Sequence, residues 1–101
     1  MPKIYEYFGL IFLFHGEDHE PIHVHIRYGE FESKVIFKYE DGILVQIEFI
    51  DSMNKQGIPK AKERDAVEFI KMFHTQIVQK WIQFYVYNLK PQFERITRKI
   101  K

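Results

Sequence analysis

Four of the five histidines lie between positions 15 and 25, and this cluster is the part of the sequence best suited to chemistry. It reads His15-Gly-Glu-Asp-His19-Glu-Pro-Ile-His23-Val-His25-Ile-Arg27. Polar and apolar residues alternate from 22 to 28, which predicts a strand with His23, His25 and Arg27 projecting from one face. Asp18 and His19 precede that strand in a loop. We therefore expect these side chains to lie close together, and the exposure of the histidine face to distinguish a chemical role from a structural one.

The cluster is compatible with three kinds of role. The pair His23 and His25, joined by His19 or Asp18, has the nitrogen and oxygen donors that Zn²⁺ or a similar divalent ion prefers. Alternatively, His23 and His25 act as general base and acid in metal-free RNA cleavage, with Arg27 stabilising the charge on the phosphorane. In the third interpretation the imidazoles are structural or bind a partner, packing on aromatic rings and donating to loop carbonyls.

Composition narrows the classes of protein. With 101 residues, of which 46% are hydrophobic and 17% aromatic, the chain is long and apolar enough for one packed domain and is not disordered. It has no cysteine, so disulfides, thiolate ligands and a cysteine nucleophile are excluded, and a reducing, cytoplasmic location is favoured. No Gly-rich phosphate loop, Gly-x-Ser-x-Gly or His-Glu-x-x-His motif occurs, which argues against the enzyme classes that use them.

The rest of the sequence predicts the elements that position the cluster. Short apolar or alternating runs indicate strands at residues 4–8, 10–15, 23–28, 31–39 and 43–50, and Asp41-Gly42 is typical of a type I′ hairpin turn. From 59 to 88 the apolar period lengthens toward 3.6, which predicts one long helix with a break near His74-Thr75. The rich supply of strand formers at 81–87 leaves a strand there as the alternative. We expect an α+β fold: an antiparallel meander of about five strands, followed by a long or broken helix packed on one face.

Residues 1–90 are predicted to form a single domain and residues 91–101 a basic C-terminal extension. Residues 1–57 carry five basic and ten acidic side chains, whereas residues 58–101 carry ten basic and four acidic ones. This split favours attraction between the two halves, with nucleic-acid binding through the basic half as the alternative. The apolar run at 8–14 is shorter than a membrane span, so no membrane association is expected.

The same residues resemble a known family. Met1-Pro-Lys-Ile leads into an aromatic, Gly-containing strand, and the pattern Asp-His-x-Pro-x-His-x-His is followed closely by Tyr-Gly-Glu; the motif positions are Asp18, His19, Pro21, His23, His25, Tyr28, Gly29 and Glu30. This arrangement resembles the small prokaryotic DUF4160 proteins, whose function is undefined. The resemblance covers roughly residues 1–85 and includes a late tryptophan, here Trp81. Glu20 and Ile22 depart from the residues that the family pattern leads us to expect, but the histidines are kept.

The resemblance implies a partner more directly than an activity. Members resemble one another in being short cytoplasmic proteins, often encoded beside a second small protein of the DUF2442 type, as in toxin and antitoxin gene pairs. The first functional hypothesis is therefore a partner-binding component of such a pair, with an exposed surface formed by His19, His23, His25 and Arg27. The alternatives are a metal-dependent or metal-free ribonuclease that uses the same residues, and a metal-binding accessory domain.

Overall fold

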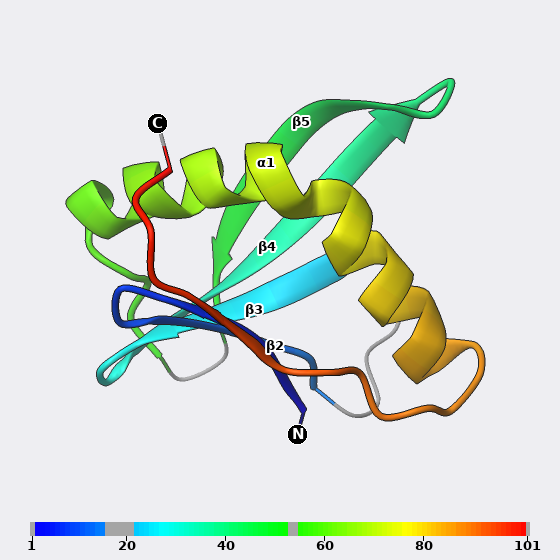
Figure 1. Ribbon diagram of the computed structural model, residues 1–101. Helices are drawn as coiled ribbons and strands as arrows, with labels where there is room; N and C mark the ends of the chain where they lie inside the picture. The colour runs from blue at the N-terminus through cyan, green and yellow to red at the C-terminus, as the bar shows by residue number, and fades with distance from the viewer. Residues whose placement is uncertain (1, 16–21, 53–54, 101) are drawn as a thin grey trace.

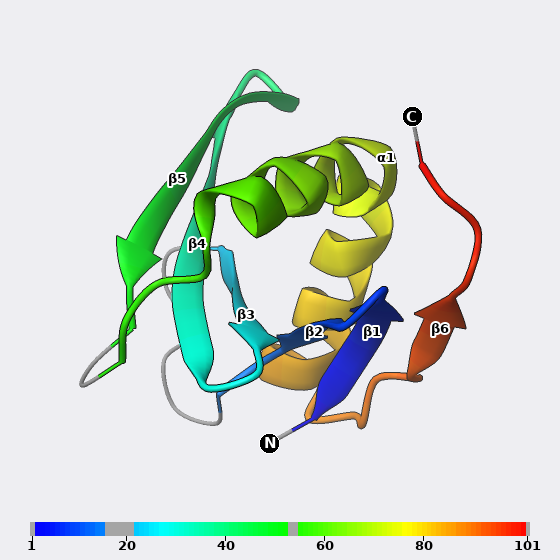
Figure 2. The same ribbon diagram turned by 90° about the vertical axis from the view of Figure 1, so that its left-hand side faces the viewer.

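The computed structural model describes residues 2–15, 22–52 and 55–100, and it consists of one sheet and one long helix (Figure 1). In chain order the elements are β1 (Lys3–Tyr7), β2 (Leu10–Leu13), β3 (His23–Tyr28), β4 (Phe31–Glu40), β5 (Ile43–Asp51), α1 (Lys60–Tyr85) and β6 (Glu94–Ile96). Figure 2 shows α1 lying over one face of the sheet. The predicted α+β fold, with a sheet packed against a helix, is confirmed.

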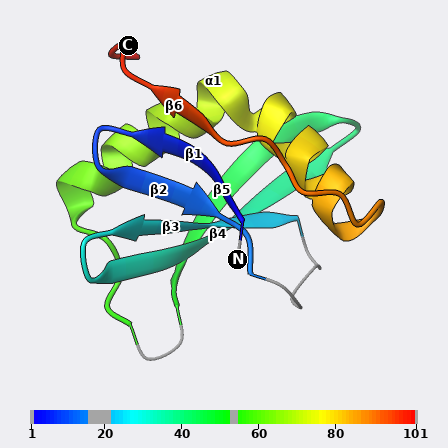
Figure 3. The same cartoon turned by 60° about the horizontal axis from the view of Figure 1, so that its bottom comes forward.

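The strands are arranged in the order β5-β4-β3-β2-β1-β6. β1 to β5 form the predicted antiparallel meander, because each strand pairs with the one that precedes it in the chain. β6 is different, since it follows the helix and pairs with β1 in parallel. Figure 3 shows β6 beside β1 at this edge. The sheet therefore has six strands and is mixed rather than purely antiparallel.

β6 belongs to the segment that the sequence predicts to be a basic extension, and the described residues 91–100 of this segment pack against the domain. Lys80 on α1 is buried, and its ammonium group donates a hydrogen bond of 2.7 Å to the carbonyl of Gln92. Ile100 is also buried, and its backbone N–H donates to the hydroxyl of Tyr7 at 2.9 Å. These contacts hold the segment along β1 on both sides of the short strand.

The hairpin turns follow from residues that adopt positive φ angles. Asp41 and Gly42 have φ of 53° and 81°, as the predicted type I′ turn between β4 and β5 requires. Phe8 and Gly9 have φ of 47° and 89° between β1 and β2, where the sequence predicts a bulge or sharp bend. A two-residue hairpin thus accounts for the bend.

A bulge in β5 changes which of its side chains face the core. The register with β4 shifts after Lys38, and Val45 becomes an extra residue without an opposite partner. Leu44 consequently packs against the core, whereas Val45 is 52% exposed. The alternation in the sequence predicts that Ile43, Val45, Ile47 and Phe49 share one core-facing side. In the structure only Ile47 and Phe49 pack against the core, whereas Ile43 and Val45 are exposed.

α1 runs without interruption over 26 residues. The predicted break near His74-Thr75 is wrong, because α1 continues through these residues to Tyr85. Figure 1 shows that the helix bends along its course without ending. The alternative of a strand at 81–87 is also wrong, since the helix continues to Tyr85. The apolar face of α1, which the 3.6-residue period predicts, packs on the sheet. Phe69 is a central contact of this face, with its ring 4.6 Å from that of Phe12. Among the described residues, no helix has the length and apolar composition needed to cross a membrane.

Candidate metal centre

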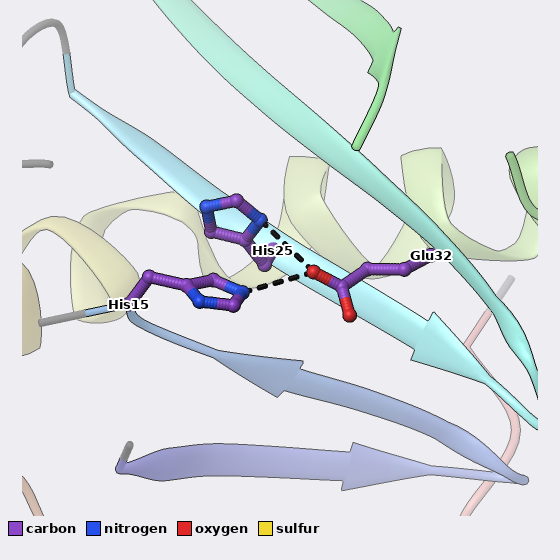
Figure 4. A group of neighbouring side chains, drawn as sticks. All are labelled: His15, His25 and Glu32. Carbon is purple, nitrogen blue, oxygen red and sulfur yellow. Dashed lines mark hydrogen bonds and ion pairs between the residues drawn. The ribbon is translucent and has the colours of Figure 1, made fainter. Parts of the chain in front are cut away.

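Three side chains from three neighbouring parts of the sheet converge on one point (Figure 4). His15 follows β2, His25 lies on β3 and Glu32 lies on β4. One donor atom from each residue can be chosen so that all three atoms lie within 4.8 Å of one another. Two imidazoles and one carboxylate are a donor set that suits divalent transition metals.

The strand pairing explains why these residues meet. The turn at Gly29 pairs Tyr28 with Phe31, which places Arg27 directly opposite Glu32 in the antiparallel register. Because side chains alternate between the faces of a strand, His25 and Arg27 share a face with Glu32. Val24 and Ile26 point the other way, into the core under α1. The site therefore lies on the face of the sheet opposite to the helical core.

Glu32 is the centre of the group. Its Oε2 accepts hydrogen bonds from His15 Nε2 at 2.9 Å and from the Ser52 hydroxyl at 3.0 Å, and it lies 3.4 Å from His25 Nδ1. Its other oxygen, Oε1, lies 3.5 Å from Arg27 Nε. Only 3% of Glu32 is exposed. A buried carboxylate of this kind is stable because several donors surround it.

The burial of His25 keeps its imidazole neutral. Removal from water, together with the nearby imidazoles of His15 and His23, lowers the pKa of His25 from 6.5 to about 4, although Glu32 acts in the opposite direction. Within the described residues, neither ring nitrogen of His25 makes a hydrogen bond. A neutral imidazole carries a hydrogen on one nitrogen and a lone pair on the other, so His25 has one donor atom available for an ion without the loss of a proton.

Glu32 is held in its charged form. Burial raises the pKa of its carboxyl, but the hydrogen bonds from His15 and Ser52, with the electrostatic influence of His15 and His25, outweigh that effect. The pKa of Glu32 consequently lies below its ordinary value. At neutral pH the group thus offers one anionic oxygen and a neutral His25.

The backbone of His15 is tied to the far end of the helix. The hydroxyl of Tyr85, the last residue of α1, donates a hydrogen bond to the main-chain carbonyl of His15. The rings of His15 and His25 meet edge to face, with centroids 3.9 Å apart. His15 is thus fixed through its backbone by α1 and through its ring by β3 and β4.

The structure places the predicted site residues unequally. It brings His25 and Arg27 together, and it places the ring of His23 5.3 Å from that of His25, outside the three-donor group. The expectation of an exposed histidine surface is wrong for His23 and His25, which are 0% and 6% exposed. Their burial arises because the face of β3 opposite α1 is also covered. Asp18 and His19 lie outside the described residues, so their role as ligands stays a prediction.

Sequence reasoning missed His15 and Glu32 as members of the site. His15 belongs to the histidine cluster, but its sequence position at the end of a strand gives no sign of which residue it meets. Glu32 had a detectable signal, because a short turn at Gly29-Glu30 puts an acidic residue opposite Arg27 on the face that carries His25. Ser52 follows β5, and nothing near it in the sequence indicates the contact.

The chain matches the family model for a domain of unknown function, DUF4160, over residues 9–82. This stretch is well over half of the chain and contains His15, His25 and Glu32. The chain belongs to the DUF4160 family. β6 of this DUF4160 protein lies beyond the matched residues. The comparisons with curated proteins and with solved structures gave no match.

Proposed function

We propose that this DUF4160 protein is a metal-binding domain that holds one divalent ion, such as Zn²⁺, between His15, His25 and Glu32. The observation that carries the proposal is the buried, neutral imidazole of His25, whose nitrogens lack hydrogen bonds within the described residues and which adjoins a second imidazole and a carboxylate. An ion that accepts an electron pair satisfies the nitrogen of His25 that carries the lone pair, whereas packing alone leaves that nitrogen unsatisfied.

The spacing of the donor atoms supports a tetrahedral ion. Zinc bonds of about 2.0–2.1 Å place neighbouring donors in a tetrahedron about 3.3–3.4 Å apart. Glu32 Oε2 lies 3.4 Å from His25 Nδ1 and 2.9 Å from His15 Nε2. Entry of the ion therefore needs small side-chain shifts, together with transfer of the His15 proton from Nε2 to Nδ1, the change of tautomer that frees Nε2 for the ion.

Two neighbours of Glu32, Ser52 and Arg27, are placed to fix the orientation of its carboxylate. Ser52 donates to the oxygen that faces the imidazoles, and Arg27 lies beside the other oxygen. Contacts of this kind fix the orientation of a ligating carboxylate. Two nitrogen donors and one oxygen donor also suit Fe²⁺, Co²⁺ and Ni²⁺, so the donor set indicates a transition metal. Which of these ions is bound depends on their availability in the cell.

The experiment is metal analysis of protein purified without a histidine tag, followed by titration of the chelator-treated protein with Zn²⁺ and Co²⁺. We expect one ion per chain. Replacing His15 by Ala, His25 by Gln or Glu32 by Gln should weaken binding by more than the roughly 10- to 100-fold that loss of an outer-sphere partner costs.

The matched control is His74→Gln, because His74 is a half-buried histidine on α1 whose Nδ1 bonds to the Tyr39 hydroxyl at 3.0 Å, away from the group. Substoichiometric binding by the wild type, or equal affinity in His25→Gln and His74→Gln, would contradict the proposal.

A second candidate function, binding of a small protein partner, is favoured by an exposed apolar surface at the end of α1 and in the segment before β6. We call this the C-terminal apolar surface, and it comprises Ile82, Val86, Tyr87, Leu89 and Phe93, which are between 37% and 66% exposed. Concentrations of exposed apolar side chains are typical of interaction sites. The resemblance to gene pairs of the toxin and antitoxin type makes a DUF2442-type protein the expected partner.

Charge pairing favours a protein over nucleic acid as that partner. Several bases of the basic half are already next to acids: Lys80 lies 3.0 Å from Glu94 and Arg95 lies 3.2 Å from Glu6. Co-purification with the neighbouring gene product tests the candidate. Tyr87→Ser should abolish the complex, while Val45→Ser, which changes an exposed residue on β5, should leave it intact. RNA binding that weakens steeply with salt, without a protein complex, would favour the basic half instead.

A further inference from the structure

We propose that the metal ion in this site binds a phosphate-class anion at an open coordination position, and that Arg27 binds the same anion beside it. This inference rests on the proposed metal site. Its ligands would be phosphate monoesters, phosphodiesters or inorganic phosphate, which share the same phosphoryl oxygens.

Counted over the described residues alone, the donors number three, which is one fewer than a closed tetrahedral site uses. Within the described residues, His15, His25 and Glu32 are the donors that converge. Zinc sites with three protein ligands keep a fourth position for water or substrate, whereas structural sites are closed by four protein ligands. Two of the three donors are buried, and His15 is the member that reaches solvent, with 32% of its side chain exposed. His15 is thus the donor residue through which solvent comes nearest to the group.

Arg27 is the second residue of the site that reaches solvent. Its side chain is 33% exposed, and its buried Nε makes no hydrogen bond within the described residues, although it lies 3.5 Å from Glu32 Oε1. The contact with Glu32 therefore anchors the guanidinium at Nε, while part of the side chain reaches solvent. A planar guanidinium is a group that proteins use to bind two oxygens of a phosphate.

The local charge favours an anion once the metal is bound. Glu32 contributes one negative charge, and a divalent ion more than neutralises it. Arg27 adds a positive charge at the Oε1 side. The ion, the carboxylate of Glu32 and the guanidinium of Arg27 together carry a net positive charge, which attracts an anion.

The geometry also selects among anions. A carboxylate that occupies the guanidinium with both oxygens has none left for the metal. Phosphate has further oxygens, so it can bridge Arg27 and the ion at the same time. The phosphate class is therefore preferred over acetate, even though both carry negative charge.

The test uses the full chain loaded with Co²⁺, whose visible spectrum reports changes at the metal. Inorganic phosphate up to about 10 mM is added, and acetate is added to a parallel sample. We expect a saturable spectral change with phosphate and a much weaker one with acetate. Arg27→Ala should lower the phosphate affinity by about 10- to 100-fold, as loss of a hydrogen bond to a charged group predicts.

Lys38→Ala is the matched control, because it removes one positive charge from β4 at an exposed residue paired with Glu48. Equal loss of affinity in Lys38→Ala and Arg27→Ala, no response to phosphate, or an equal response to acetate would overturn the inference. It would also be overturned if His19→Ala lowered metal affinity as much as His15→Ala, because a fourth protein ligand then closes the site. Failure of Co²⁺ to bind at all would instead reject the metal site itself, so the two failures are distinguishable.

Discussion

The carboxylate of Glu32 on β4 reaches across β3 and accepts a hydrogen bond of 2.9 Å from the imidazole of His15, which follows β2. The two residues are 17 positions apart in the chain, and β3 with its His25 lies between them. The site therefore forms only when three strands are in register. Its integrity is a direct measure of the pairing of the sheet.

Removing the charge of Glu32 should destabilise the protein even without metal. In Glu32→Gln the side chain keeps its size but loses the charge that His15, Ser52 and Arg27 surround. We expect the free energy of unfolding, measured by denaturant titration in the presence of a chelator, to fall by about 1–3 kcal/mol. Glu48→Gln is the control, because Glu48 forms an exposed ion pair with Lys38 and should change stability by less than about 1 kcal/mol. Equal effects of the two substitutions would show that Glu32 has no special role.

The metal-free protein should lose stability as the pH falls from 6.5 toward 4. The pKa of His25 is lowered to about 4 in the folded state, so in this range the unfolded chain binds a proton that the folded chain does not. A difference of this size corresponds to about 3 kcal/mol of unfolding free energy. The lowered pKa of Glu32 acts in the same direction, because the stability it contributes is lost as the pH falls through its folded pKa.

Denaturant titrations at several pH values measure this effect, and His25→Gln identifies its source. Glutamine does not titrate, so the variant should show a shallower loss of stability between pH 6.5 and 4. A wild-type curve that is flat in this range, or a variant curve of equal slope, would mean that His25 is not a buried neutral imidazole.

Tyr85→Phe should weaken metal binding without removing a ligand. The hydroxyl of Tyr85 holds the main-chain carbonyl of His15, and its loss frees the backbone of a donor residue. We expect metal affinity to fall by about tenfold, in the range of an outer-sphere substitution, in a competition titration with a coloured chelator. Tyr39→Phe removes a comparable hydroxyl, which bonds to His74, and should leave the affinity unchanged. Equal affinities in the two variants would show that α1 does not position His15.

Lys80→Met should release the C-terminal strand while leaving the rest of the sheet intact. Lys80 donates to the carbonyl of Gln92 and lies 3.0 Å from the carboxylate of Glu94, and these contacts bracket the start of β6. Hydrogen exchange should become faster at the amides of β6 but not at those of β3. Lys71→Met, at an exposed position on the same helix, serves as the reference. Unchanged exchange in β6 would show that its pairing with β1 is sufficient by itself.

The sequence predicts those parts of the fold that depend on local patterns. Alternation and the Asp41-Gly42 turn identify the meander, and a 3.6-residue period identifies α1. β6 escapes prediction because it has three residues and two of them are charged, so its pairing with β1 depends on tertiary contacts alone. The bulge at Val45 is not predicted either. One extra residue moves the side chains at one end of the strand to the opposite face of the sheet, and the alternation of apolar and polar residues does not reveal it.

The candidate site was predictable to the extent that it is local. His25 and Arg27 share one strand face, as their spacing of two requires. Glu32 and His15 belong to the flanking strand and strand end, and their place follows from register, which the sequence specifies only through the turn at Gly29. The burial of His23 and His25 contradicts the expectation of an open surface, because burial depends on what covers the second face of the sheet.

The bulge at Val45 also makes β5 a poorer template for a strand from another molecule. β5 is an outer strand of nine residues, and its unpaired backbone groups together with exposed Ile43 and Ile50 would suit growth of the sheet from one molecule into the next. The extra residue interrupts the regular hydrogen-bonding ladder between the two ends of this strand, so an incoming strand cannot follow it along its whole length. At the opposite edge β6 has only three residues. Each molecule therefore ends its own sheet, and fibre growth is opposed at both edges.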